Sequence, residues 1–184
     1  LMFNKSHPAV IFGLSENGLA IARSLGKQGI KVYGIGFSKG YAYYSKYLEG
    51  YVFPHPEKDE TEFIKSVENF CDKLESKPVI FVENDEYLKF YTRNDSFVKK
   101  YFLSNLPDPK LVHSISDKYK QYKLTKNAGI DVPKTFLVNS IKSIDDIKDS
   151  IDYPVFIKAQ DVNIWRKKVS GHTKGFVINK DRKS

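Results

Sequence analysis

The stretch AVIFGLSENGLAIARSLGKQGIKVYGI, residues 9–35, decides the fold class. Its first four residues are a short apolar run, followed by a turn with glycine at both ends and then by apolar residues at helical spacing. Gly26 and Gly29 supply stop signals for this helix, and KVYGI (Lys31 to Ile35) starts a second strand. The order strand, helix, strand predicts two parallel strands of one sheet.

The same alternation continues downstream. GYVF (Gly50 to Phe53) is typical of a strand, and Glu60 to Leu74 carries apolar residues along one helical face. VIFV (Val79 to Val82) is a continuous apolar run, which favours a strand covered on both faces. We therefore predict an α/β fold with a parallel, doubly wound, Rossmann-like sheet.

After Glu83 the pattern changes, because helical stretches follow one another up to a boundary that we place near His113. The predicted domains are residues 1–113 and 114–184. The second domain is predicted to contain the helix DKYKQYKLTKNAG, a strand at Thr135 to Val138, a helix near Ser143 to Ser150, and strands at Val155 to Lys158 and Phe176 to Ile178.

Composition limits the choice of partners. The net charge is +8, but 26 of the 30 basic residues are lysines and they are spread along the chain, which favours a solvated surface over a nucleic-acid site. No apolar run is long enough to span a bilayer. The single cysteine, Cys71, excludes an internal disulfide framework and is expected to be a small core residue, so we predict a cytoplasmic protein.

Two turns are candidate substrate sites. GLSENG lies at a strand-to-helix turn, where Ser15, Asn17 and free backbone N–H groups could hold an anion. A dinucleotide fingerprint would need glycine at position 15 and a carboxylate after KVYGI, so NAD binding is disfavoured. The two remaining interpretations of GLSENG are a structural tight turn and a site for a substrate carboxylate.

The second turn is Glu83, Asn84 and Asp85, directly after the strand VIFV. Ligands of open α/β sheets bind beyond the carboxyl ends of the strands, so these three residues are candidate substrate ligands. The alternative is that Asn84 or Asp85 only caps the next helix, and the two interpretations are compatible.

The four histidines have no metal-ligand spacing among themselves or with Cys71, so we predict no metal site in this chain. No phosphate loop or nucleophile elbow is present either. Two lysines remain: Lys118 follows Asp117 at a helix start, and Lys158 ends the strand PVFIK. A lysine ammonium suits phosphate oxygens, and a charge at the end of an apolar strand needs a partner.

The order of these pieces resembles the ATP-grasp superfamily, closest to the carboxylate–amine ligases that include D-aspartate ligase-like enzymes. The resemblance covers essentially the whole chain. It rests on GLSENGLAIARSLGKQGIKVYGI, SKYLEGYVFPHP, KPVIFVENDEYL, SDKYKQYKLTKNAGIDVPKTFLV and YPVFIKAQDVNIWRKKVSGHTKGFVI. It implies a Rossmann-like domain that does not itself bind the nucleotide, followed by the first, small ATP-binding subdomain of an ATP-grasp fold.

The resemblance also implies roles for single residues. Lys118 and Lys158 match the two lysines that contact ATP phosphates in such enzymes. The segment after Lys158 matches the mobile loop over the triphosphate, which gives Ser170, Gly171 and Lys174 as further ATP contacts. Many relatives have a glycine-rich loop there, and this chain departs from it with a more basic segment.

The implied reaction transfers the γ-phosphoryl group of ATP to a carboxylate, and an amine then attacks the acyl phosphate. The implied cofactors are ATP and Mg²⁺, with the Mg²⁺ ligands on a C-terminal part that would follow this chain. We therefore expect the N-terminal part of a ligase for amino-acid or peptide-like substrates, inactive by itself. The alternative is a non-catalytic module that binds a metabolite or a protein. The oligomeric state is left open, with a homodimer as one option.

Overall fold

The structure is a computed structural model that describes residues 6–159 and 175–179. The chain divides into two compact units, Leu1–Val112 and His113–Ser184. The division falls inside helix α5 (Pro109–Ser116). Each unit is described by itself below.

The first unit contains a four-stranded sheet of β1 (Ala9–Phe12), β2 (Val32–Gly36), β3 (Glu49–Val52) and β4 (Val79–Val82). The strand order is β3-β2-β1-β4, and every pair of neighbours is parallel. β1 and β4 have the predicted bounds, whereas β2 and β3 are each displaced by one residue from the prediction. The predicted doubly wound α/β fold is confirmed.

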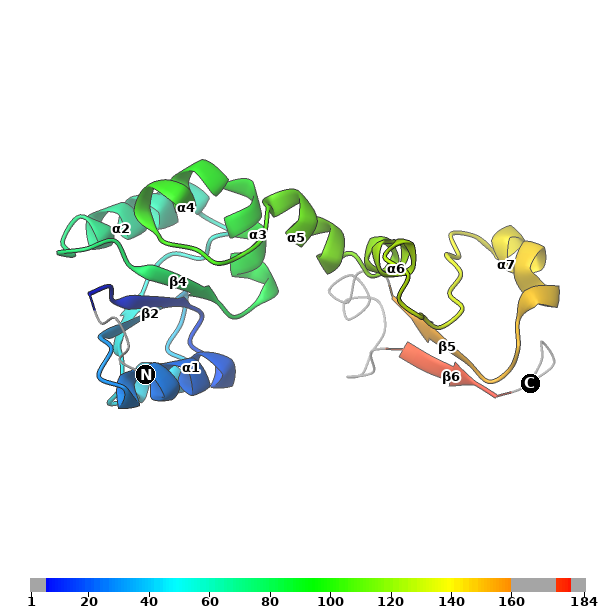
Figure 1. The fold of residues 1–184 in the computed structure, drawn as a ribbon, viewed down its shortest axis with the longest axis horizontal. Coiled ribbons are helices and arrows are strands. Elements are labelled where there is room, and N and C mark those ends of the chain that lie inside the picture. The colour runs from blue at the N-terminus through cyan, green and yellow to red at the C-terminus, as the bar shows by residue number, and fades with distance from the viewer. Residues whose placement is uncertain (1–5, 160–174, 180–184) are drawn as a thin grey trace. The chain divides into compact units, whose positions relative to one another are not determined.

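Helices cover both faces of this sheet, as Figure 1 shows. α1 (Glu16–Lys27) lies on one face, and α2 (Glu60–Cys71), α3 (Asp85–Arg93) and α4 (Asp95–Tyr101) lie on the other. Because side chains alternate along a strand, β1 contributes to both layers. Ala9 and Ile11 belong to the cluster that contains Ala22 of α1. The residues between and after them, Val10 and Phe12, belong to the larger cluster beneath the other three helices.

Phe12 lies at the centre of the larger cluster. Its ring is fully buried, and four aromatic rings surround it at centroid distances between 5.4 and 6.3 Å. These four are Phe63, Tyr87, Phe90 and Phe102. Buried aromatic pairs in tilted or edge-to-face geometry add about 0.5–1.5 kcal/mol each beyond their area burial. Aromatic packing therefore fixes α2 and α3 on the sheet.

The strand order places a topological switch point between β1 and β4. The chain moves outward from β1 through β2 and β3, with the short 3-10 helix η1 (Tyr41–Tyr44) before β3, and then returns to add β4 on the other side of β1. Ligands of open α/β sheets bind at such a point, beyond the carboxyl ends of the strands. The two predicted substrate turns follow β1 and β4, so the fold brings them to this position.

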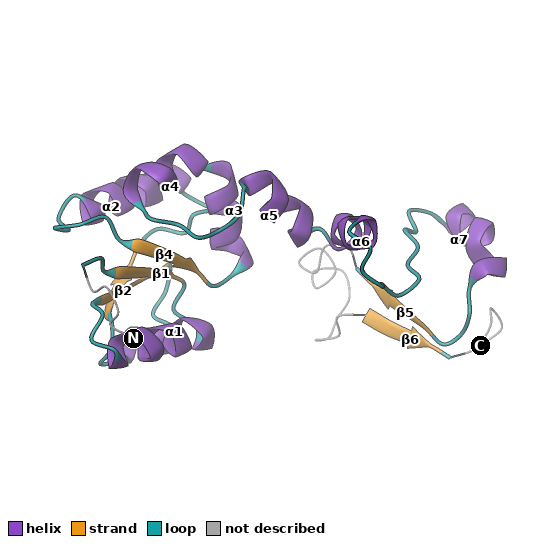
Figure 2. Ribbon diagram, viewed as in Figure 1, coloured by secondary structure: helices purple, strands orange, loops and turns teal. Residues whose placement is uncertain are grey.

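The second unit contains α6 (Lys118–Asn127), α7 (Ile141–Ile147), the 3-10 helix η2 (Lys148–Ser150), β5 (Val155–Lys158) and β6 (Gly175–Ile178). β5 and β6 form an antiparallel pair, coloured orange in Figure 2. No residue of α6, α7, β5 or β6 is buried within the described part of the chain.

One predicted strand of the second unit is wrong. Residues 135–138 lie outside any helix or strand. A strand exists only where its backbone pairs with another strand, and among the described residues the sheet of this unit consists of β5 and β6 alone. The predicted helix near Ser143 begins earlier, at Ile141, because the Ser140 side chain accepts the backbone N–H of Ser143 in a capping box.

Within residues 6–159 and 175–179, no helix combines the length and the apolar character that crossing a bilayer requires.

Candidate functional site

At the switch point, the turn after β1 and the end of β4 meet through one carboxylate, that of Glu83. Its Oε2 accepts hydrogen bonds from the Ser15 hydroxyl and from the Gly18 backbone N–H at 3.1 Å. Its Oε1 lies 3.4 Å from the Ser15 backbone N–H and 3.4 Å from the Asn84 side-chain amide, both of which donate. Three of the five predicted substrate residues, Ser15, Glu83 and Asn84, are thus brought together.

Gly13 makes this arrangement possible. Its φ of +117° is a conformation that side chains other than hydrogen rarely tolerate. A Cβ at this position would lie 2.0 Å from Cγ and from Oε1 of Glu83. The first glycine of the turn is therefore needed so that Glu83 can lie across the start of α1.

The cluster changes the interpretation of the turn. The N-terminus of a helix attracts an anion, and the carboxylate of Glu83 already takes that position at α1. A dinucleotide would place its pyrophosphate there, so this finding also opposes NAD binding. Asn17 takes part only through its backbone N–H, which donates to the Ser15 hydroxyl oxygen at 3.2 Å, and Asp85 lies in the first turn of α3 outside the cluster.

Asn84 has the structural role that we considered as an alternative. Its Oδ1 accepts the backbone N–H groups of Glu86 and Tyr87, both at 3.1 Å, and it is the N-cap of α3. The capping interpretation is confirmed for Asn84. Its amide group still reaches Glu83, so one side chain joins the helix start to the carboxylate cluster.

In the second unit, the side chain of one predicted ATP-contacting lysine, Lys118, reaches the backbone next to the other, Lys158. The Lys118 ammonium donates to the carbonyl oxygen of Ala159 at 3.0 Å, and Ala159 directly follows Lys158. Asp117 caps the start of α6 by accepting the N–H groups of Tyr119 and Lys120 at 3.0 Å each. The start of α6 and the end of β5 therefore form one locality with two cationic side chains.

The ammonium of Lys158 lies 5.3 Å from the centre of the Phe156 ring, a cation–π contact along β5. The predicted loop residues Ser170, Gly171 and Lys174 lie outside the described residues. Among the residues that the structure describes, no group of three His, Cys, Asp or Glu side chains could hold a metal ion.

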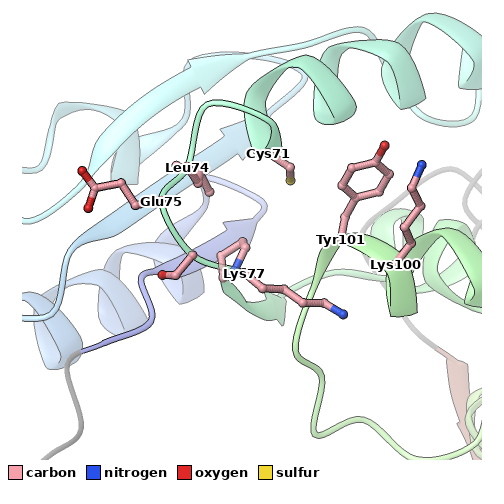
Figure 3. Close-up of a pocket in the computed structure, with 8 residues that line it drawn as sticks. Cys71, Leu74, Glu75, Lys77, Lys100 and Tyr101 are labelled. Atoms are coloured by element: carbon pink, nitrogen blue, oxygen red, sulfur yellow. The ribbon is translucent and has the colours of Figure 1, made fainter.

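A shallow hollow of about 220 Å³ lies away from these positions, next to Pro78, which precedes β4. Figure 3 shows Cys71 from the end of α2 and Lys100 and Tyr101 from α4 around it. Burial, with a smaller effect of the neighbouring Asp72, raises the pKa of the Cys71 thiol to about 12. The thiol is therefore protonated at neutral pH, in agreement with the predicted core role and not with a nucleophile.

Sequence reasoning missed a second group of side chains at the carboxyl edge of the sheet. Phe37 follows β2, His55 lies three residues beyond β3, and Glu86 is in the first turn of α3. The rings of Phe37 and His55 are in contact in a tilted geometry, with centroids 4.3 Å apart. The signal in the sequence was position alone, since each residue lies just after a predicted strand.

The two units define a parallel α/β domain followed by a helix and an antiparallel strand pair that carries lysines. The solved structures of similar fold include the following three. N5-carboxyaminoimidazole synthetase from Staphylococcus aureus, complexed with ADP, matches 98% of this chain with a TM-score of 0.69 at 18% identity. L-amino acid ligase from Bacillus licheniformis also matches 98%, with a TM-score of 0.69 at 14% identity. N5-carboxyaminoimidazole ribonucleotide synthetase from Thermotoga maritima matches 96%, with a TM-score of 0.62 at 18% identity.

This chain spans about two-fifths of each of these proteins, namely 44%, 39% and 42% of their lengths. No protein-family model and no curated protein matches the sequence. At these identities the likeness concerns the fold. The predicted resemblance is confirmed at the level of the fold.

Proposed function

We propose that this chain is the N-terminal part of an ATP-dependent ligase that joins a carboxylate to an amine. The observation that carries the proposal is the hydrogen bond from Lys118 to the carbonyl of Ala159, because it joins the start of α6 to the residue that follows Lys158. The fold supports it, since one of the similar structures is a synthetase complexed with ADP and another is an L-amino acid ligase.

In this proposal Lys118 and Lys158 bind the phosphate groups of ATP, as two cations on separate elements can neutralise oxygens of one polyphosphate. Ser170, Gly171 and Lys174 complete the phosphate contacts. ATP would supply the phosphoryl group that activates the carboxylate for attack by the amine. The residues that the structure describes do not offer a ligand set for Mg²⁺, so no step through the metal is assigned to them.

The substrates proposed are an amino-acid or peptide-like carboxylate and an amine, and Ser15, Asn17, Glu83, Asn84 and Asp85 lie at the switch point where such a substrate would bind. Because the Ser15 hydroxyl is hydrogen-bonded to the carboxylate of Glu83, we assign Glu83 the role of holding the turn. A substrate at this edge would then contact residues around Glu83 and not its carboxylate. We propose that residues 1–184 alone bind nucleotide weakly and do not turn over.

Nucleotide binding by the 184-residue chain tests the proposal. ATP affinity is measured by calorimetry for wild type, Lys118→Ala, Lys158→Ala and the matched control Lys120→Ala, which lies in the same first turn of α6. We expect each of the first two substitutions to weaken binding about tenfold, the effect of losing one charge-assisted hydrogen bond, and the control to stay within twofold. Equal affinity in all four proteins, or no binding by wild type, would overturn the proposal.

A further inference from the structure

The group formed by Phe37, His55 and Glu86 is built from three different strand ends. Phe37 directly follows β2, His55 follows β3, and Glu86 belongs to the helix after β4. The carboxyl ends of parallel strands meet at one edge of the sheet, which is where ligands of such folds bind. The group therefore lies at a functional edge, next to the Glu83 cluster that the turn already uses.

The hydrogen bonds of His55 fix the form of its ring. Its Nδ1 accepts the backbone N–H of Glu57 at 3.1 Å, so in the neutral ring the proton is on Nε2. Nε2 lies 3.6 Å from Oε2 of Glu86, which is longer than a direct hydrogen bond. The carboxylate of Glu86 therefore lies beside His55 without a short hydrogen bond to its ring.

Three other carboxylates near this edge, those of Glu57, Glu60 and Glu83, are paired or hydrogen-bonded. Glu57 pairs with Lys89 at 3.5 Å and with Arg93 at 3.8 Å, and Glu60 pairs with Arg93 at 2.7 Å. Glu83 is held by the turn after β1. Lys89 is one helical turn beyond Glu86, but its ammonium lies against Glu57. Among the described residues, no lysine or arginine pairs with Glu86, and its neighbour at this edge is His55.

An aromatic surface adjoins this carboxylate. Phe37 is 38% exposed and contacts the ring of His55, whose side chain is 17% exposed, while the side chain of Glu86 is 37% exposed. The centre of the Tyr87 ring lies 6.1 Å from that of Phe37. A partly exposed aromatic ring and a carboxylate without a lysine or arginine partner thus occur together.

We propose that Phe37, His55 and Glu86 form a binding site for an organic ammonium group. The ammonium would form an ion pair with Glu86 and lie over the face of Phe37, the combination by which proteins recognise organic cations. His55 is the positioning residue, since its ring contacts that of Phe37 and its Nε2 lies 3.6 Å from Oε2 of Glu86. The inference rests on the proposed function in one respect, because it gives the amine substrate of that ligase a place in the first unit.

The test uses the 184-residue chain and three probes of matched shape: n-butylammonium, n-butanol and n-butyrate. NMR follows the His55 ring and the Glu86 backbone amide, with the rings of His7 and His113 as internal references. We expect saturable shifts at both positions with n-butylammonium in the millimolar range, and no saturable shift with the alcohol or the carboxylate. Equal shifts with n-butanol, a preference for n-butyrate, or no shift at all would each overturn the proposal.

Variants separate the contributions of the side chains. Glu86→Gln should weaken n-butylammonium binding at least fivefold and Phe37→Leu about threefold, with circular dichroism confirming that both variants are folded. Glu62→Gln is the matched control, because Glu62 is an exposed carboxylate of α2 that already pairs with Lys65 at 3.3 Å, and it should leave binding unchanged. Unchanged binding in Glu86→Gln would overturn the site.

The proposal of an ammonium site and the proposal of a nucleotide site can be contradicted independently of each other. Loss of ATP binding on Lys118→Ala with intact n-butylammonium binding supports both proposals. An absence of ATP binding by wild type, with n-butylammonium binding retained, overturns the proposed ligase and leaves the ammonium site standing. ATP binding without n-butylammonium binding overturns only the site at Phe37, His55 and Glu86.

Discussion

The carboxylate of Glu83 accepts the hydroxyl hydrogen of Ser15, and this bond joins the end of β4 to the turn that starts α1. It crosses the topological switch point of the sheet, between β1 and β4. A second bond from the Gly18 N–H, at 3.1 Å, gives the N-terminus of α1 an internal anion. The chain therefore stabilises with its own side chain the position at which related architectures hold a ligand.

Substitution of Gly13 by alanine should be strongly destabilising. The new Cβ would lie 2.0 Å from Glu83 atoms, on a backbone with φ of +117°. Backbone strain and overpacking each cost roughly 1–3 kcal/mol, so we expect Gly13→Ala to lower the free energy of unfolding by about 3 kcal/mol. Urea denaturation of the first unit, followed by circular dichroism, measures this.

A double-mutant cycle separates the two costs. Glu83→Ala removes the side chain that the new Cβ would meet but keeps the positive φ, so Gly13→Ala should cost less in the Glu83→Ala background than in wild type. If Gly13→Ala costs the same in both backgrounds, the close contact between Gly13 and Glu83 is not what the glycine is for.

Asn84 should contribute measurably to stability through its cap. Asn84→Ala leaves the N–H groups of Glu86 and Tyr87 without their acceptor, and the loss of such a cap costs about 1 kcal/mol. Asn84→Ser keeps a capping oxygen and should recover most of this loss. Chemical denaturation of the three proteins gives the comparison, and a serine variant as unstable as the alanine variant would contradict the capping role.

Cys71 should resist alkylation in the folded protein. Burial raises the pKa of its thiol to about 12, from an ordinary value of 9.0, so the thiolate is rare at pH 8. At equal access the unfolded thiol should react at least about tenfold faster, because its lower pKa gives more thiolate. Iodoacetamide labelling followed by mass spectrometry is unambiguous here, since the chain has one cysteine. Equal labelling rates with and without urea would contradict the burial.

The raised pKa of the Cys71 thiol also predicts a loss of stability at alkaline pH. Between about pH 9 and 12 the unfolded chain releases the thiol proton while the folded chain keeps it, so the free energy of unfolding falls as the pH rises. Cys71→Ser lacks this group and should lose less stability between pH 8 and pH 10.5 than wild type. Denaturation midpoints at the two pH values provide the measurement, and an equal loss in both proteins would refute the prediction.

The first unit was predictable because its signals are local. Val79–Val82 is a continuous apolar run and Ala9–Phe12 another, and both strands have the expected bounds. Hydrophobic periodicity encodes which residues are buried, so it predicts the strands and helices that bury them. The stretch at residues 135–138 has the same apolar character, yet it pairs with no strand among the described residues, because pairing depends on a partner that local sequence does not contain.

The site was harder to predict than the fold. Glu83 and Ser15 were each expected at a ligand position, but their bond to each other depends on the side-by-side packing of β1 and β4. Phe37 and His55 are separated by 18 positions in the sequence. Only the parallel pairing of β2 with β3 brings the centres of their rings to within 4.3 Å of each other. Residue type suggested the chemistry of the first pair, whereas only the position after a predicted strand pointed to the second.

The strand pair β5–β6 should be the least protected part of the described chain. Its four large apolar side chains, Phe156, Ile157, Phe176 and Val177, are 46–55% exposed, and a two-stranded sheet is only marginally stable alone. Backbone amides of β1, whose residues are at most 2% exposed, belong to the opposite extreme. Hydrogen exchange with peptide-level mass spectrometry should therefore show β5 exchanging at least 100-fold faster than β1.

The same hydrogen-exchange experiment can be repeated with ATP, because a ligand that binds only the folded form protects the element that it contacts. If ATP binds through Lys118 and Lys158, exchange in β5 should slow on addition of ATP, and it should not slow in Lys158→Ala. Exchange in β1 should be the same with and without ATP and serves as the internal control. Protection of β5 equal to that of β1 without ligand would contradict the marginal stability of the pair, whereas ATP-induced protection confined to β1 would place the nucleotide on the first unit.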